Sequence, residues 1–182
     1  MDVPKTVALR SGERVLWEGK TEPFGVLSGP AGRAILRQWL IGAGMIAAIL
    51  ALYVTDTRYL SAVPIVTLCL TMAAMLVIPF LERARLLRRR YYITNERAIV
   101  ASGSRAASME RAAIDEYRLC EGRDGAKSVV LGSALRHEPD KELRYLGLYP
   151  EVNREPGQAP FIDGMVFYGV EDAEAAEHAL AR

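Results

Sequence analysis

The side chains that most often carry out chemistry are few in this sequence, and their spacing forms no known metal site. The chain has two histidines, His137 and His178, and two cysteines, Cys69 and Cys120. Neither histidine lies near a CxxC pattern, an HExxH pattern or a carboxylate–histidine cluster, so we expect no zinc, no iron and no cofactor. Cys69 lies in an apolar stretch and Cys120 in a polar region, so a disulfide between them is geometrically implausible.

The sequence also lacks the motifs of nucleophilic and phosphate-transfer enzymes. It contains no G-x-S-x-G pattern, no P-loop and no phosphate-binding glycine pattern at the start of a helix. The carboxylates within 138–142 stand among Lys141 and Arg144, an arrangement typical of a solvated surface. We therefore predict a protein without catalytic residues, and keep a membrane enzyme of unrecognised type only as the last of three alternatives.

Arginine is the residue type whose clustering indicates a binding chemistry, because guanidinium groups bind anions. Residues 82–90 hold five arginines and one glutamate, whereas residues 91–182 hold 11 Lys and Arg against 16 Asp and Glu. The acidic body of the chain argues against nucleic acid as a partner, while basic residues at a membrane attract anionic lipid head groups, by about 1 kcal/mol each. The candidates for contact with head groups, or for fixing membrane topology, are Arg33, Arg37, Arg83, Arg85, Arg88, Arg89 and Arg90.

Two apolar stretches separate the first of these arginines from the others. Residues 39–54 and 60–80 contain no Asp, Glu, Lys, Arg or His. A helix needs roughly 20 apolar residues to cross a hydrocarbon core of about 30 Å. We predict a transmembrane hairpin over 34–81, with helices at about 34–54 and 60–81 and a tight polar turn between them. The alternative, two core helices of a soluble protein, is disfavoured because such helices rarely run this far without a polar residue.

The charges beside these stretches predict the orientation of the hairpin. Lys and Arg are retained on the cytoplasmic side of a membrane, and the arginines flank the outer ends of the two spans, so both termini should be cytoplasmic. More than 30 largely polar residues precede the first span, which does not fit a signal peptide. The first span also carries small residues on one face, which let helices approach closely. We favour their packing within the hairpin over association between copies, and these residues are Ala43, Gly44, Ala47, Ala48 and Ala51.

Outside the hairpin, the pattern of the chain is mainly that of β-strands. Strands are predicted over 13–19, 91–94, 97–101, 127–131 and 165–168, with extended structure also over 108–112 and 114–121. The proline-rich segment 136–163 is predicted as a long loop with one ordered piece at 145–149. A helix over 173–180 begins after Asp172, its predicted N-cap. We therefore divide the chain into an N-terminal cytoplasmic segment (1–33), the hairpin (34–81) and a cytoplasmic domain (82–182).

The order of several short motifs carries a resemblance. The chain reads GERVLWEGK, then the hairpin, then an arginine-rich exit, YYITNERAIV, CEGRDGAKSVVL and DGMVFYGVEDAEAAEHAL. This order resembles the bacterial pleckstrin-homology (PH)-type membrane proteins. The resemblance implies an α+β, mainly β, fold, in which a bent seven-stranded β-sandwich or barrel is closed by the C-terminal helix. It also implies a multi-pass protein of the bacterial inner membrane.

One residue of these motifs is a candidate for binding. Arg97, in YITNER, could hold an anionic group, although a basic residue just after a turn more often pairs with a nearby carboxylate. We predict a non-enzymatic module that docks a protein or lipid surface at the cytoplasmic face. The alternative is an accessory or assembly subunit of a larger membrane complex. The expected partners are anionic membrane lipids together with a membrane protein or a second copy of the chain.

Overall fold

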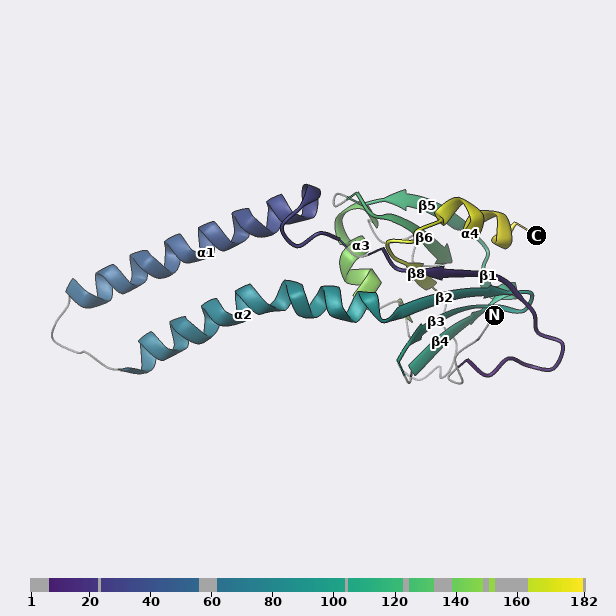
Figure 1. Cartoon of the computed structure of the whole chain (residues 1–182), viewed down its shortest axis with the longest axis horizontal. Coiled ribbons are helices and arrows are strands. Elements are labelled where there is room, and N and C mark those ends of the chain that lie inside the picture. The colour runs from purple at the N-terminus through teal and green to yellow at the C-terminus, as the bar shows by residue number, and fades with distance from the viewer. Residues whose placement is uncertain are drawn as a thin grey trace. The chain divides into compact units, whose positions relative to one another are not determined.

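The computed structural model is an α+β fold with two antiparallel sheets and two long apolar helices (Figure 1). It describes residues 7–22, 24–55, 62–103, 105–122, 125–132, 139–148, 151–152 and 164–181. The chain forms two compact units, one made of Gly25–Arg83 and the other of Met1–Phe24 together with Ala84–Arg182.

The first unit consists of two helices, which are each long and apolar enough to cross a membrane. Helix α1 runs over Gly29–Thr55 and helix α2 over Ala62–Leu87. In the most apolar window of each helix, only 11% and 6% of the residues are buried, so both helices are largely exposed in this structure. Both helices extend beyond the predicted apolar limits. Pro30 fits the first turn of α1, where no donor is needed, and α2 continues through the polar residues that follow Phe80.

The two helices contact each other along a seam that differs from the small-residue face of α1. The indole Nε1 of Trp39 donates a hydrogen bond of 3.0 Å to the carbonyl of Met75, and its ring stacks on Phe80 at 6.3 Å. Gly42 is buried in this seam, where an added Cβ would lie 2.5 Å from the Cε of Met75. Of the five predicted packing residues only Ala43 is half-buried, and the other four are exposed.

The second unit contains a sheet of four strands in the order β1-β2-β3-β4. These are β1 (Val15–Lys20), β2 (Arg89–Thr94), β3 (Arg97–Ser102) and β4 (Arg105–Glu110). Strands β1 and β2 are direct neighbours, with Lys20 opposite Arg90, although both long helices lie between them in the sequence. The pairing of β1 with β2 therefore holds the segment before α1 beside the segment after α2.

A second sheet has the order β5-β6-β8-β7 and follows a short 3₁₀ turn, η2 (Arg111–Ala113). Its strands are β5 (Tyr117–Glu121), β6 (Lys127–Gly132), β7 (Glu151–Val152) and β8 (Gly164–Phe167). Two further helices are α3 (Pro139–Leu148) and α4 (Ala173–Leu180). The turn η2 interrupts the extended structure that was predicted between 108 and 121.

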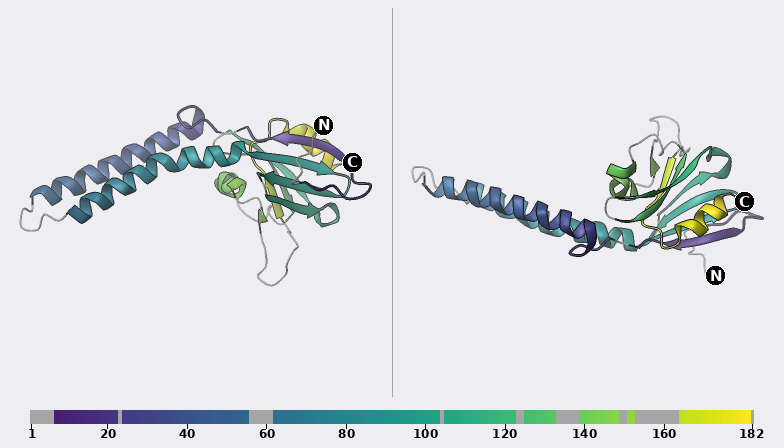
Figure 2. Two further views of the ribbon diagram at one scale, coloured as in Figure 1. Left: turned by 60° about the horizontal axis from the view of Figure 1, so that its bottom comes forward. Right: turned by 90° about the horizontal axis from the view of Figure 1, so that it is seen from above.

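The hydrophobic core lies between the two sheets and α4. Alternate residues of a strand face opposite sides, so Tyr91 and Ile93 of β2 enter this core while Tyr92 lies in a separate small cluster with Val7. Helix α4, yellow in Figure 2, contacts strands of both sheets. Its first turn is capped by Asp172, as the sequence predicts, because the side chain accepts a hydrogen bond of 3.0 Å from the amide of Ala175.

The segment 136–163 is where the structure departs most from the sequence prediction. Its described residues form a ten-residue helix, α3, and the short strand β7 rather than a continuous loop. Pro139 is the first residue of α3, a position at which the missing backbone donor has no cost. Leu143 and Leu146 are buried, which gives the helix an apolar face. The other residues of 136–163 lie outside the described parts of the chain.

Candidate functional site

Strand β2 carries a polar cluster at each of its ends. The strand begins at Arg89 and ends at Thr94, positions that are separated by about 17 Å in an extended chain. We call the groups around Thr94 the Glu13 cluster and those around Arg89 the Arg89 cluster.

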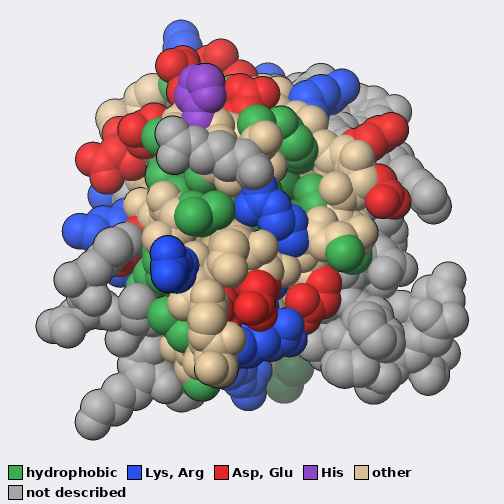
Figure 3. Space-filling view, turned by 90° about the vertical axis from the view of Figure 1, so that its right-hand side faces the viewer, with side chains coloured by type: hydrophobic (Ala, Val, Ile, Leu, Met, Phe, Trp, Pro, Cys, Tyr) green, Lys and Arg blue, Asp and Glu red, His purple; other side chains and the backbone are tan. Residues whose placement is uncertain are grey.

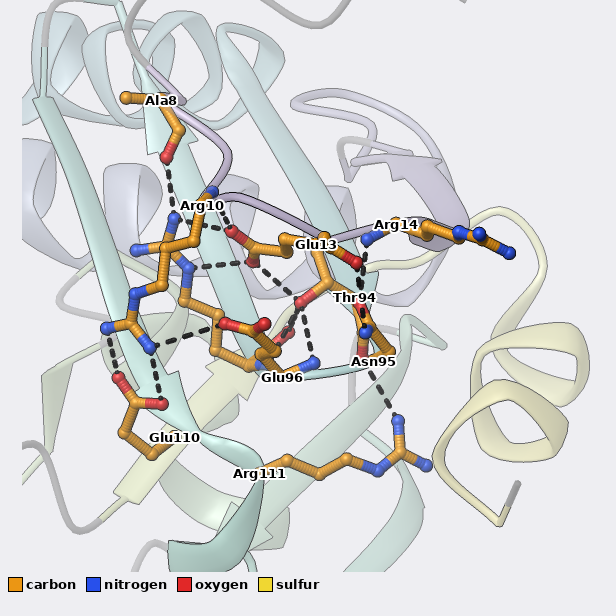
Figure 4. A network of polar contacts seen from close by, with 11 residues as sticks. Ala8, Arg10, Glu13, Arg14, Thr94, Asn95, Glu96, Glu110 and Arg111 are labelled. Atoms are coloured by element: carbon orange, nitrogen blue, oxygen red, sulfur yellow. Dashed lines mark hydrogen bonds and ion pairs between the residues drawn. The ribbon is translucent and has the colours of Figure 1, made fainter.

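The Glu13 cluster joins the segment before β1 to the turn between β2 and β3 (Figure 4). Arg97 donates from Nε to Oε1 of Glu13 at 2.8 Å and from Nη2 to Oε2 at 3.0 Å. The hydroxyl of Thr94 lies 2.8 Å from the same Oε1, and it accepts from the amide of Arg97 at 2.9 Å. The side chain of Glu13 has no exposed surface, and that of Arg97 is 14% exposed. This bidentate ion pair is therefore enclosed by protein.

Opposing effects act on the pKa of Glu13, and the lowering effects dominate. Burial raises the pKa, but hydrogen bonds from Arg97, from the amide of Arg10 and from Thr94 stabilise the carboxylate and bring its pKa to about 2. Glu13 therefore stays charged at any physiological pH. The pair with Arg97 is the outcome that the sequence favours for a basic residue after a turn, and it leaves Arg97 with its donors directed at Glu13 and at the carbonyl of Ala8.

Further contacts of the Glu13 cluster connect it to other elements of the same unit. Arg10 forms a two-pronged contact with Glu110 of β4, at 2.6 and 3.0 Å. Asn95 accepts from the amide of Arg14 at 2.7 Å, which explains its place in the turn. Arg111 bridges the cluster to α4, because it donates to the carbonyl of Thr94 and to the last carbonyls of the helix.

The Arg89 cluster lies at the opposite end of β2. Helix α2 ends at Leu87, so only Arg88 separates the helix from Arg89. Arg89 is only 6% exposed. Its Nη1 donates to the carbonyl of Gly147, and its Nη2 donates to the carbonyl of Leu148 at 2.5 Å. Both acceptors lie in the last turn of α3, so the guanidinium caps the C-terminal end of that helix.

Hydroxyl groups lie beside this guanidinium. Tyr91 donates a hydrogen bond of 3.0 Å to the carbonyl of Tyr168, and its hydroxyl accepts one from Thr21 at 3.1 Å. Burial raises the pKa of Tyr91, while Thr21 and Arg89 act in the opposite direction. Burial also lowers the pKa of Arg89, because removal of water disfavours the charged guanidinium. The side chains of Arg89 and Tyr91 therefore share a poorly solvated environment.

The hydrogen-bonding capacity of Arg89 is only partly used. Its Nε is buried and has no acceptor among the described residues. No carboxylate of the described chain lies within ion-pair distance of it either. A buried cation with this set of neighbours is uncommon, since buried charges are normally paired.

The other arginines of the predicted head-group set differ from Arg89. Arg85 and Arg88 are exposed beside it in the sequence, and Arg90 is half-buried; Arg33 and Arg37 are exposed on α1. Arg83 is half-buried at the end of the first unit. Strand alternation therefore separates Arg89, on the inner side of the sheet, from neighbours that sequence alone treats as equivalent.

The candidate metal-ligating side chains are not gathered at one place in the described residues. No group of three His, Cys, Asp or Glu side chains that could hold a metal ion is found among them. His178 is exposed on α4, and His137 lies outside the described residues. The face of the molecule shown in Figure 3 carries acidic and basic side chains side by side.

Sequence reasoning missed the Arg89 cluster, although part of its signal was present. The period of two in Arg89-Tyr91-Ile93 places the arginine on the face of two core residues, provided that the strand begins as early as residue 89. Its contact with α3 could not be foreseen, because a helix was not expected at 139–148. Comparisons of the chain with protein-family models, with curated proteins and with solved structures find no match.

Proposed function

We propose that this chain is a non-enzymatic protein of the bacterial inner membrane, whose β-sandwich is an interaction module held at the cytoplasmic surface. In this proposal α1 and α2 span the bilayer as a hairpin and both termini are cytoplasmic. The observation that carries the proposal is the exposure of apolar side chains along both helices.

The extent of that exposure is hard to reconcile with water as the solvent. Soluble proteins rarely expose continuous apolar patches of more than a few hundred Å². On α1 the exposed large side chains are Leu36, Leu40, Ile41, Met45, Ile49, Leu52 and Val54. On α2 they are Val63, Ile65, Val66, Leu70, Leu76, Val77, Ile78, Phe80, Leu81 and Leu87. Lipid tails are the solvent that such surfaces favour.

The orientation rests on the arginines and on the charge of the module. The exposed Arg33, Arg37, Arg85 and Arg88 flank the outer ends of the two helices and favour a cytoplasmic position for both ends. The same residues attract anionic head groups. The acidic balance of residues 91–182 concentrates this attraction in the segment next to the membrane.

The fold of the module is proposed to be PH-like. The support is the pair of antiparallel sheets that enclose one core, with a C-terminal helix, α4, packed against both. Among the strands of the described residues, seven are longer than two residues. That number equals the strand count that the sequence resemblance implies.

Membrane fractionation with alkaline carbonate tests the anchoring of the full-length chain. An integral protein stays in the membrane pellet after the wash and is released only by detergent. As a matched pair, Met45→Arg and Leu36→Arg place the same charge near the middle of the apolar stretch of α1 and next to its basic end. We expect the first to impair insertion more than the second, because a charge costs more at the bilayer centre. Release of the unmodified protein by carbonate would contradict the proposal.

A second role, as an accessory or assembly subunit, is favoured by one specific observation. Gly44, Ala47, Ala48 and Ala51 are exposed on α1 rather than being used in the seam with α2. Small residues on a lipid-facing surface allow another helix to approach closely. Purification in mild detergent followed by mass spectrometry distinguishes the roles. A stoichiometric membrane-protein partner that is lost in Ala47→Leu supports the subunit role, while recovery of the chain alone supports a self-contained module.

A further inference from the structure

Arg89 combines burial, positive charge and incomplete hydrogen bonding. The side chain belongs to a residue that is 6% exposed, and its Nε has no acceptor among the described residues. Removing a guanidinium from water is costly, and proteins normally offset that cost with an anion. In the described chain no carboxylate performs this role for Arg89. The residue therefore retains a capacity to bind an anion.

The carbonyl groups that face Arg89 in this structure carry only a partial negative charge. Gly147 and Leu148 supply carbonyls from the last turn of α3, which are not used in hydrogen bonds within a helix. The C-terminal end of a helix has a partial negative charge equivalent to about half an elementary charge. A phosphate group carries a larger charge and more acceptor oxygens, so it competes with these carbonyls for the same donors.

Helix α3 depends on tertiary contacts for its position. With ten residues it is too short to be stable alone, because isolated helices below about 12 residues are marginal in water. Leu143 and Leu146 are buried, and Gly147 is packed so closely on Tyr168 that an added Cβ would lie 2.5 Å from the Cβ of the tyrosine. A single methyl group at position 147 thus opposes the docking of the helix.

We propose that Arg89 is the anion-recognising residue of a phosphate-binding site, and that the C-terminal turn of α3 occupies this site in the absence of phosphate. Bound phosphate accepts from the guanidinium of Arg89 and displaces the carbonyls of Gly147 and Leu148. The α3 helix then leaves its position on β8. No covalent step is involved, and phosphate binding and the docking of α3 exclude each other.

The chemistry of the cluster suits phosphate in particular. The planar guanidinium presents parallel donors that match two phosphate oxygens, and the unused Nε adds to this fork. The hydroxyl of Tyr91 lies beside the guanidinium, and its proton is donated to the carbonyl of Tyr168. The source of the phosphate follows from the proposed function, which places the segment containing Arg89 at the membrane surface and so favours an anionic lipid head group.

The test uses the full-length protein in a mild, uncharged detergent, with two probes. Short-chain phosphatidic acid presents phosphate on a lipid, and inorganic phosphate presents it free in solution; phosphatidylcholine is the control lipid. Native mass spectrometry measures the fraction of protein with bound lipid, and amide hydrogen exchange measures the protection of residues 139–148. We expect phosphatidic acid to increase exchange in 139–148, whereas phosphatidylcholine leaves it unchanged.

Two substitutions with opposite predicted effects make the test specific. Gly147→Ala displaces α3 and should lower the phosphatidic acid concentration for half-saturation by about tenfold, because the competing state is depopulated. Arg89→Lys keeps the charge but loses the fork, and Arg89→Gln loses both, so binding should fall in that order. The control Arg105→Gln removes an exposed arginine of β4 that has no assigned role in lipid contact, and it should retain the exchange response of 139–148.

The outcomes of this test distinguish two questions, whether Arg89 binds phosphate and whether that phosphate belongs to a lipid. A response to inorganic phosphate equal to that for phosphatidic acid supports the site and makes the ligand a soluble phosphate. A response to neither probe, or a loss of binding in Gly147→Ala similar to that in Arg89→Gln, would overturn the proposal by giving Arg89 a structural role only. The membrane-anchored function fails by a different result, release of the protein from membranes by carbonate.

Discussion

Glu13 and Arg97 form a bidentate ion pair, with Oε1 and Nε 2.8 Å apart, although both apolar helices lie between them in the chain. The pair closes the end of the sheet that is formed by β1 and β2. It therefore fastens the segment that precedes the hairpin to the segment that follows it. The polar residues of the YITNER motif are explained by this structural role, because Thr94 and Arg97 both contact Glu13.

Removing the carboxylate of this pair should destabilise the sandwich strongly. Glu13→Gln leaves the guanidinium of Arg97 enclosed without an anion, and breaking a buried pair typically costs about 3 kcal/mol or more. Glu110→Gln is the matched control, because its carboxylate is 41% exposed and its partner Arg10 is 50% exposed, so solvent screens this pair and its loss should cost much less. Denaturant unfolding, followed by the fluorescence of Trp17 in a Trp39→Phe background, measures both. Equal losses in the two variants would contradict the assigned roles.

The pH dependence of stability should report the same carboxylate. The pKa of Glu13 is lowered from 4.5 to about 2 in the folded protein, so its charged form stabilises the fold. This stabilisation is complete above the unfolded pKa of 4.5 and is lost as the pH falls towards about 2. Unfolding measured at a series of pH values should show a decline in this window, and Glu13→Gln should flatten it. An unchanged slope in the variant would exclude Glu13 as its source.

Arg111 should hold the C-terminal helix in place. It donates to the carbonyls of Ala179 and Leu180 at 3.1 and 2.7 Å, and hydrogen bonds to charged groups contribute about 1.5–3 kcal/mol. Arg111→Met should therefore increase hydrogen exchange in α4 and lower the free energy of unfolding by about 2 kcal/mol. Arg105→Met, on the exposed start of β4, provides a control of identical chemistry. Exchange in α4 that stays unchanged would show that core packing alone holds the helix.

The seam of the hairpin can be tested with two glycines that lie two residues apart. Gly42 faces Met75 with no room for a side chain, whereas an added Cβ at Gly44 meets nothing within 4 Å. Gly42→Leu should separate the helices and shift the emission of Trp39, whose indole contacts Met75 and Phe80. Gly44→Leu should leave that emission unchanged. A shift in both variants, or in the second alone, would contradict the seam.

The sequence predicts most strands and both long helices, because their signals are local. Period-two alternation in β2 and β3 and the absence of charge in the two apolar stretches need no tertiary information. Helix α3 was missed because four prolines suggested a loop. Yet Pro139 at its start and Gly147 near its end are boundary signals, and Leu143 and Leu146 have helical spacing.

The site was less predictable than the fold, since it depends on contacts between distant segments. Arg88, Arg89 and Arg90 are three identical residues in a row, so residue type does not tell them apart. Arg89 faces inward because β2 begins at residue 89 and its side chains alternate between the two faces of the sheet. Similarly, Ala47 and Gly42 are both small residues of one helix. Which of them lies against α2 depends on Trp39 and Met75, large side chains that set how the helices meet.

The most direct test of the central claim is cysteine labelling of the hairpin turn and of the sandwich. Cys69→Ala and Cys120→Ala remove the native thiols; Thr57→Cys then marks the turn predicted between the spans, and Glu174→Cys marks the exposed surface of α4. In spheroplasts of a bacterial host, a membrane-impermeant maleimide should label position 57 directly and position 174 only after permeabilisation. Labelling of position 174 in intact spheroplasts, or protection of position 57, would contradict a membrane hairpin with a cytoplasmic module.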